Sequence, residues 1–210
     1  MSVLAELALA DDADAWRAAG FEVGVDDICM VGNVTLRFVG AAAGGTPIRS
    51  WGIAGSPDES ILDIDGLATE HVEPAAVEAG HHPLGVRAID HLVVMTPNVE
   101  RTTAAVERCL GVPLRRARDG QSAGRAVRQT FFRLGAVILE IAGPPEPEAD
   151  AGPARFWGLA LTVDSLEHAA HVLGTERLGP SRPAVQPGRS IATVRSATGL
   201  RVPVALMSAD

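Results

Sequence analysis

Two stretches of the sequence decide the fold: Ala88-Ile-Asp-His-Leu-Val-Val-Met95 and Trp157-Gly-Leu-Ala-Leu-Thr-Val163. His91 recurs 67 residues later as Gly158, whereas Glu140 recurs only 63 residues later as Pro203. The missing four residues fall in the intervening helix, and deletion of one helical turn leaves its apolar face in place. The pattern therefore predicts two copies of one unit, of which only the first carries a histidine and a glutamate.

Each copy is predicted to be a βαβββ module. In the first module, residues 87–143, Asn98 caps a helix of helically spaced apolar residues and Gly111 ends it. The proline-rich stretch 144–155 is predicted to be a linker, and residues 156–207 the second module. The remaining strands are predicted at 114–117, 126–134 and 136–142 in the first module, and at 190–196 and 200–206 in the second.

The amino-terminal region, residues 1–80, resembles a degenerate and truncated third copy, and residues 81–86 a linker. Ile48-Arg-Ser-Trp-Gly-Ile-Ala is similar to Ala154-Arg-Phe-Trp-Gly-Leu-Ala in the second module. The truncated copy is expected to pack within the chain, and a homodimer remains possible. The other elements of this copy are predicted as a strand at 3–9, a helix at 13–19 and strands at 28–31 and 34–39.

Composition excludes several functions. The chain of 210 residues is 47% apolar with a net charge of -8, which argues for a globular protein and against a nucleic-acid partner. It contains no Lys and no Tyr, so Schiff-base chemistry and a tyrosine acid are excluded. Cys29 and Cys109 are expected to be buried thiols. No apolar run predicts a membrane span and no secretion signal is recognised, so a cytoplasmic location is expected.

Several motifs together resemble the vicinal oxygen chelate superfamily, which includes glyoxalases, bleomycin-resistance proteins and extradiol dioxygenases. They are Ile89-Asp-His-Leu, Leu110-Gly, Phe131-Phe-Arg-Leu-Gly, Ile138-Leu-Glu, Gly158-Leu-Ala-Leu-Thr-Val-Asp-Ser-Leu and Thr198-Gly-Leu. The resemblance implies an α+β fold in which paired βαβββ modules form curled mixed sheets around a cavity. It also implies metal-ligand positions on the first and last strands of each module, here His91, Glu140, Gly158 and Pro203.

Metal binding is expected to be weak or absent. Gly158 and Pro203 offer no donor atom, and two ligands fall short of the three that hold Fe, Mn, Ni or Zn well. His71, His81 or His82 could complete the set only if the amino-terminal region reached the cavity. Without metal, His91 and Glu140 are the candidate catalytic residues, as a general base or an orienting pair, although a packed relic of a lost site is the alternative.

Ligand-binding residues are predicted around this pair. The candidates are two aromatic residues for an apolar wall and four donors for an anionic or accepting group, although an ordinary charged hairpin would look the same. They are Gln129, Phe131, Trp157, Arg182, Gln186 and Arg189.

Three functions remain open from the sequence. The leading prediction is a glyoxalase-like protein that binds a small organic molecule between its modules, with metal-independent or weakly metal-assisted chemistry. The second is a metal-free protein that sequesters a drug or metabolite. The third is a divalent-metal lyase, isomerase or dioxygenase that completes its ligand set from elsewhere in the chain.

Overall fold

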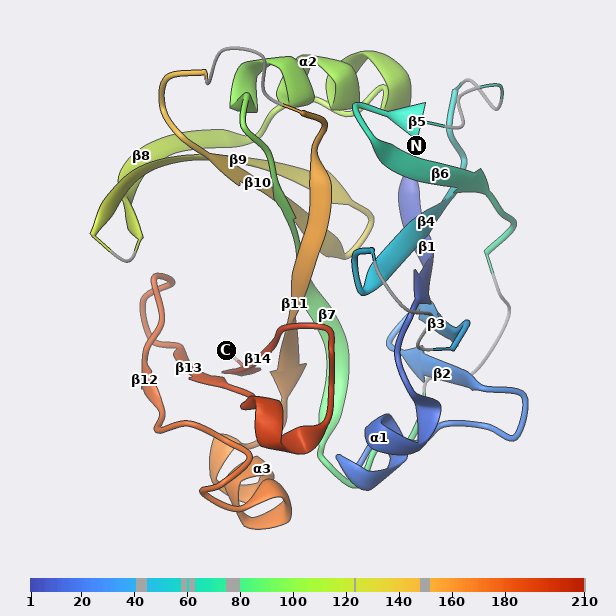
Figure 1. The fold of residues 1–210 in the computed structure, drawn as a ribbon, viewed down its shortest axis with the longest axis vertical. Helices are drawn as coiled ribbons and strands as arrows, with labels where there is room; N and C mark the ends of the chain where they lie inside the picture. The colour runs from blue at the N-terminus through green and yellow to red at the C-terminus, as the bar shows by residue number, and fades with distance from the viewer. Residues whose placement is uncertain are drawn as a thin grey trace.

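The computed structural model describes residues 1–40, 45–57, 60, 63–74, 80–122, 124–147 and 152–209. They form two mixed sheets packed against each other (Figure 1). The carboxy-terminal sheet contains β7 (Val86–Met95), β8 (Arg116–Ser122), β9 (Arg125–Leu134), β10 (Val137–Gly143), β11 (Arg155–Val163), β12 (Arg182–Pro183), β13 (Ser190–Thr193) and β14 (Val204–Ser208), in the order β12-β13-β14-β11-β7-β10-β9-β8.

The central strands of this sheet, β7 and β11, are antiparallel and related by the predicted repeat. Leu92 pairs with Leu159, while His91 pairs with Ala160 and Val93 with Gly158. If each residue of β7 corresponds to the residue 67 positions later, Leu92 pairs with its own equivalent, and its two neighbours pair with each other's equivalents. The register is therefore symmetric for the offset that the sequence repeat predicted. The sheet is thus built from two equivalent halves that meet along β7 and β11.

The helices follow the same repeat. α2 (Val99–Leu110) has 12 residues and α3 (Leu166–Leu173) has 8, so the second helix is one turn shorter, as expected. The Asn98 side chain accepts a hydrogen bond from Arg101 N, and Gly111 ends α2 with a left-handed φ of 63°. The predicted caps therefore fix where α2 starts and stops.

The strand predicted at 200–206 begins later than expected. After a 3₁₀ turn, η1 (Ser196–Thr198), Gly199 takes a φ of 83°, and the ladder with β11 starts only at Val204. Proline has no N–H to give to a strand partner, so Pro203 precedes the strand instead of lying within it.

The amino-terminal sheet contains the predicted third copy and extends beyond it. Its elements are β1 (Val3–Leu9), α1 (Ala13–Ala18), β2 (Ile28–Val31), β3 (Val34–Phe38), β4 (Ile48–Ala54), β5 (Asp63–Ile64) and β6 (Leu67–His71). β1 is parallel to β3 and antiparallel to β4, as β7 is to β10 and β11, and β4 is parallel to β6 as β11 is to β14. The region therefore keeps the strand order of two reduced modules.

The two sheets bury apolar side chains between them. Trp51 of β4 and Phe156 of β11 meet edge to face with ring centroids 5.3 Å apart, and Leu92, Val94 and Leu159 are buried in the same core. This packing covers one face of β7 and β11. The strands and hairpins of the carboxy-terminal sheet curl so that its other, open face points away from the amino-terminal sheet (Figure 1).

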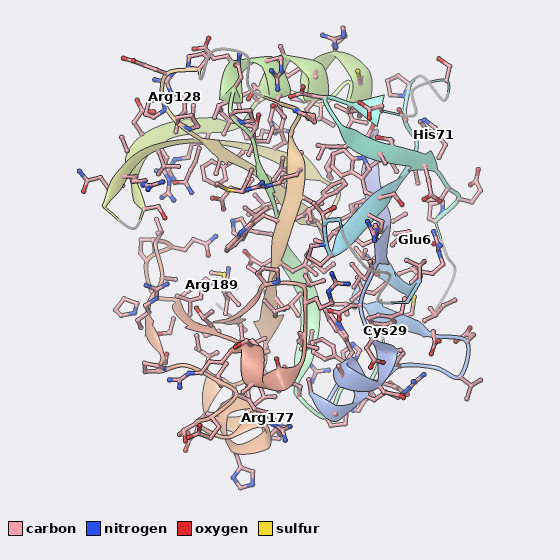
Figure 2. All side chains as sticks on the ribbon, viewed as in Figure 1. Glu6, Cys29, His71, Arg128, Arg177 and Arg189 are labelled. Atoms are coloured by element: carbon pink, nitrogen blue, oxygen red, sulfur yellow. The ribbon has the colours of Figure 1, made fainter. Side chains whose placement is uncertain are left out.

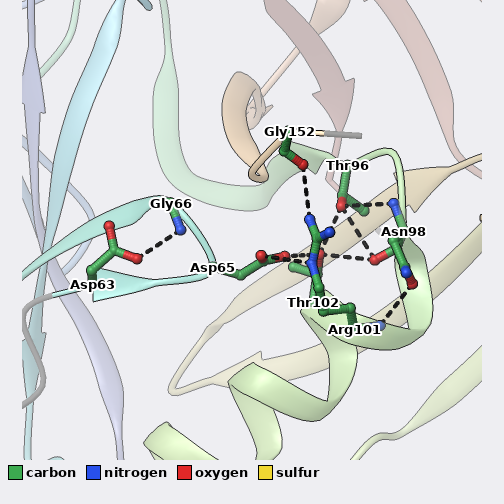
Figure 3. A network of polar contacts seen from close by, with 8 residues as sticks. All are labelled: Asp63, Asp65, Gly66, Thr96, Asn98, Arg101, Thr102 and Gly152. Carbon is green, nitrogen blue, oxygen red and sulfur yellow. Dashed lines mark hydrogen bonds and ion pairs between the residues drawn. The ribbon is translucent and has the colours of Figure 1, made fainter. Parts of the chain in front are cut away.

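A polar cluster joins the edge of the amino-terminal sheet to α2 (Figure 3). The carboxylate of Asp65, in the β5–β6 turn, accepts hydrogen bonds from Arg101 Nε at 2.8 Å and from Thr102 Oγ1 at 2.5 Å. The Asp65 carbonyl accepts a third from Ala154 N at 2.8 Å, and Arg101 also reaches the Gly152 carbonyl. One turn thus holds the start of α2 and the segment that enters β11.

Candidate functional site

His91 and Glu140 lie on adjacent strands and on the same, open face of the carboxy-terminal sheet. In the parallel pair of β7 and β10, His91 is opposite Ile138 and Val93 is opposite Glu140. Paired residues share a face, and the face alternates along each strand. The intervening Leu92 is fully buried against the other sheet. The two candidate catalytic residues therefore share one face of the sheet.

Asp90 joins His91 on the open face because β7 is bulged. Its neighbours Ile89 and His91 pair with the consecutive residues Leu161 and Ala160, so Asp90 has no partner on β11. Its Oδ1 accepts a hydrogen bond of 2.6 Å from Arg189, and its Oδ2 lies against Nδ1 of His91. The second is a close contact without the alignment of a regular hydrogen bond.

These contacts keep Asp90 ionised. Burial by itself would raise the pKa of Asp90, but its contacts with His91 and Arg189 outweigh burial and lower the pKa to about 2. The side chains of Asp90 and His91 are only 13% and 12% exposed. A buried carboxylate therefore stands beside the imidazole at any pH above about 4.

Arg189 supports this carboxylate and is itself buried. Its Nε donates to the Ser208 carbonyl at 2.8 Å and its terminal nitrogens donate to Asp90, Gln186 Oε1 and Thr162 Oγ1. The sequence predicted Arg189 and Gln186 as ligand-binding donors. The structure brings both to the site, but their polar groups are engaged with each other and with Asp90.

A second chain of polar groups ends at Glu140. The Gln129 amide nitrogen donates a short hydrogen bond to Glu140 Oε1, and Gln129 Oε1 accepts one of 2.8 Å from Arg118 Nε. The Arg118 guanidinium lies 5.4 Å from the centre of the Phe131 ring, whose centroid is 6.5 Å from that of His91. Gln129 and Phe131 therefore lie beside the pair, as expected.

Two predicted ligand-binding residues lie apart from this group. Trp157 is an extra, bulged residue of β11 between Phe156 and Gly158, and its side chain is 49% exposed. Arg182 is exposed on the two-residue edge strand β12. Neither forms a hydrogen bond, ion pair or ring contact with His91 or Glu140 in the described part of the chain, whereas the Phe131 ring lies next to His91.

The sequence analysis missed Asp90 and Arg118. Neighbouring residues of a regular strand point to opposite faces, so a regular strand would turn Asp90 away from His91, and only the bulge brings it to the open face. Arg118 lies in the basic stretch Arg115-Arg116-Ala-Arg118, a pattern that is typical of a solvated strand or turn. The signals available were an acidic residue directly before the histidine and an arginine on the strand that pairs with Gln129.

Comparison with known proteins agrees with this geometry. The family model described as Glyoxalase/Bleomycin resistance protein/Dioxygenase superfamily matches residues 88–186. Residues 88–186 are a domain of this superfamily. A search of curated sequences found no match, and no helix in the described ranges is both long and apolar enough to cross a bilayer.

Solved structures extend the likeness to the whole chain. A mutant of 4-hydroxymandelate synthase from Streptomyces coelicolor aligns with a TM-score of 0.70 and 13% identity, covering 99% of this chain and 92% of that one. Methylmalonyl-CoA epimerase from Mycobacterium tuberculosis aligns with 60% of this chain and 90% of its own, at a TM-score of 0.47 and 15% identity. The first of these shows a shared fold that includes the amino-terminal sheet.

The glyoxalase-superfamily domain does not place a full ligand set on its open face. Glu140 is opposite Val93, two residues after His91, and the equivalent position of β14 is opposite Ala160, two residues after Gly158. That position is Ala205. The expectation that Pro203 takes the place of Glu140 is therefore wrong, because two more residues lie between the modules' last strands than the motif alignment allowed. Neither Ala205 nor Gly158 has a donor side chain, so the second module still contributes none.

The amino-terminal histidines do not complete the set. His82 is buried within the amino-terminal region, where its ring nitrogens bond Glu22 N and the Met30 carbonyl. His71 is on β6, on the side of the molecule opposite Arg189 (Figure 2). In the described part of the chain, no three His, Cys, Asp or Glu side chains are grouped to hold a metal. The donors present do not fit a tightly held ion.

The curled carboxy-terminal sheet agrees with the expected fold, and its concave side is the open face (Figure 1). A groove of ≈ 400 Å³ lies on the other face of the sheet, between α2 and β8, and its lining includes Val99, Thr103 and Thr130 but neither His91 nor Glu140. Arg128 in its lining is paired with Asp119 and Glu100, whereas Arg118 borders both this groove and the open face.

Proposed function

We propose that the open face binds a small organic anion and that His91 exchanges a proton with it, without a tightly held metal. The observation that carries the proposal is the convergence of two polar chains, one ending at His91 and the other at Glu140, on neighbouring strands of one face. Groups able to move a proton and a cationic donor then surround the same small area.

Arg118 is the proposed anion-binding residue. Its Nε is used by Gln129, while its two terminal nitrogens have no partner among the described residues. Two parallel N–H groups of a guanidinium match a carboxylate or phosphate, and the aromatic ring of Phe131 next to it suits an apolar ligand body. This placement replaces Arg182 and Arg189 as the anchor of the acceptor end.

His91 is the proposed proton-transfer group. The Asp90 carboxylate against Nδ1 favours the tautomer with its proton on that atom, which leaves Nε2 as a base. No residue in the described part of the chain hydrogen-bonds Nε2. A ligand with an acidic C–H next to Nε2 loses its proton to the imidazole, and the resulting imidazolium, whose proton exchanges with water, returns a proton to the same carbon.

Binding can be tested by thermal shift with a panel of organic carboxylates, benzoate included. A ligand of the folded state raises the melting temperature with its occupancy. Arg118→Gln should abolish the shift, whereas Arg108→Gln, an exposed residue at the end of α2, should leave it unchanged. A shift that survives Arg118→Gln would exclude this anchor.

Proton transfer can be tested with bound carboxylates that have an acidic α-hydrogen. In deuterated water the native protein should catalyse exchange of this hydrogen, and His91→Asn should slow exchange by about 100-fold or more while the affinity stays within a few fold. If the native protein catalyses no exchange and His91→Asn only weakens binding, the catalytic part of the proposal is refuted.

A second candidate is a sequestering protein that binds the same anion and does no chemistry. It is favoured by the absence of donor side chains at Gly158 and Ala205, since the second module then offers nothing to an intermediate. Tight binding combined with no α-hydrogen exchange would favour this candidate.

A further inference from the structure

The hairpin of β8 and β9 has different charges on its two faces. Arg116 pairs with Phe131 and Arg118 with Gln129, so both arginines share the open face with these residues. Arg125, four residues before Gln129 on β9, also lies on that face. The open face of the hairpin therefore has three arginines in a chain whose net charge is -8.

No carboxylate neutralises these arginines among the described residues. On the opposite face of the same hairpin, Arg128 is paired with Asp119 at 2.8 Å and with Glu100 at 3.4 Å. Arg116 and Arg125 are exposed and have no such partner in the described ranges. Pairing on one face and unpaired cations on the other indicate that the open face receives its anion from a ligand.

The three arginines form a track along the hairpin, in the order Arg116, Arg118 and Arg125. Gly120 lies between Arg118 and the hairpin end, opposite Val127, and a Cβ at Gly120 would meet no atom within 4 Å. The strand rises about 3.3 Å per residue, so the track from Gln129 to Arg125 is about 13 Å long. A single carboxylate cannot contact arginines at both ends of such a track, but a chain of phosphates can.

We propose that the ligand of the open face has a tail with two or more phosphate groups that lies along Arg116, Arg118 and Arg125. This inference rests on the proposed function, because the tail includes the anion placed at Arg118. It adds the class of ligand: a phosphorylated organic molecule in which the group that reacts near His91 is separated from its main negative charge.

Binding at the tail and at the head of this ligand can be measured separately, with inorganic tripolyphosphate as the probe for the tail and benzoate as the probe for the head. Their affinities should be measured by titration calorimetry at low salt for the native protein and for Arg116→Gln, Arg125→Gln, Arg118→Gln and Arg108→Gln. We expect Arg116→Gln and Arg125→Gln each to weaken tripolyphosphate roughly three- to five-fold, since exposed ion pairs are individually weak. Neither should change benzoate binding, and Arg108→Gln should change neither affinity.

Gly120→Glu provides an independent test, because the site tolerates a side chain and the new charge would occupy the track. It should weaken tripolyphosphate more than either single arginine variant and leave the unfolding midpoint unchanged. Tripolyphosphate affinity that is equal in the native protein, Arg116→Gln, Arg125→Gln and Gly120→Glu would overturn the inference. Tighter binding of a 20-nucleotide single-stranded DNA with the same arginine dependence would overturn it as well, in favour of a nucleic-acid surface. A benzoate affinity that is unchanged in Arg118→Gln would instead refute the proposed function.

Discussion

The carbonyl oxygen of Pro203 lies 2.5 Å from the point where a Cβ of Gly158 would stand. The same carbonyl accepts a hydrogen bond of 2.9 Å from Leu159 N, which holds the two backbones together at the start of the β11–β14 pair. Gly158 is therefore required by a close backbone approach. The position cannot be turned into a metal ligand by adding a side chain, because there is no room for one.

Gly158→Ala should lower the free energy of unfolding by about 1–3 kcal/mol, because the added methyl group forces the Pro203 backbone to move. Urea unfolding measures this effect. Gly120→Ala is the matched control: it adds the same atom on another strand of the same sheet, where nothing lies within 4 Å, and should change stability by less than about 0.5 kcal/mol. Equal effects of the two variants would refute the steric explanation.

Metal affinity should rise when a carboxylate is introduced at position 205 and stay unchanged when one is introduced at position 203. The unmodified protein should contain a divalent ion well below stoichiometry, and Ala205→Glu should raise Zn(II) affinity at least about ten-fold, because it adds a carboxylate at the register position of Glu140. Pro203→Glu should have no such effect. Metal content of protein purified without chelator, with zinc titrations of both variants, decides this. Stoichiometric metal in the unmodified protein would restore the metalloenzyme alternative.

The sequence predicted regular structure well and irregular structure poorly. The family motifs placed His91 and Glu140 on the first and last strands of one module, which lie side by side, and the 67-residue offset between the two copies agrees with the symmetric register of β7 and β11. The bulge at Asp90 could not be predicted, since it depends on the partner strand. The position equivalent to Glu140 was assigned to Pro203 instead of Ala205 for the same reason. Motif alignment does not take loop length into account, whereas the register of β14 is fixed by its pairing with β11.

Asp90 should make stability depend on pH in the acid range. Its pKa of about 2 in the folded protein is below the ordinary value of 3.8, so its contribution is fully present above about pH 4 and is lost as pH falls toward 2. The shift corresponds to about 2 kcal/mol.

Unfolding free energies between pH 6 and 2 should show this loss in the native protein and a smaller loss in Asp90→Asn. Asp119→Asn, on an exposed ion pair, is the control and should keep most of the native slope. An unchanged slope in Asp90→Asn would show that Asp90 is not stabilised as described.

His82 should make stability depend on pH in a second, higher range. Burial lowers its pKa below 6.5, although the hydrogen bond to the Met30 carbonyl and the charge of Glu22 raise it, and His81 and Arg87 lower it further. A lowered pKa means that the unfolded chain binds the proton more readily, so stability falls as pH drops below about 6.5. Protonation would also remove the Nδ1 lone pair that accepts from Glu22 N.

The difference in unfolding free energy between pH 8 and pH 5.5 should be smaller in His82→Gln than in the native protein. It should be unchanged in His171→Gln, because His171 is an exposed residue of α3. Identical pH dependence in both variants would assign the effect to other groups.

Asp11 should be among the residues on which the joining of the two sheets depends most. It is 1% exposed, and its Oδ2 accepts hydrogen bonds from Trp16 Nε1 at 3.0 Å, from Arg201 N at 2.9 Å and from Val202 N at 3.2 Å. Two of these donors belong to the segment that leads into β14, so one carboxylate anchors the amino-terminal sheet to the second module. Asp11→Ala would leave these three donors, and also Asp12 N, which donates to Oδ1 at 2.9 Å, without their acceptor and should cost about 3 kcal/mol or more. Asp12→Ala, next in the chain, loses only the cap bond to Asp14 N and should cost about 1 kcal/mol. Urea unfolding followed by tryptophan fluorescence measures both, because Trp16 and Trp51 are buried in the amino-terminal sheet. If Asp11→Ala costs no more than Asp12→Ala, the sheets are held by apolar packing such as that of Trp51 on Phe156, and the Asp11 hydrogen bonds add little.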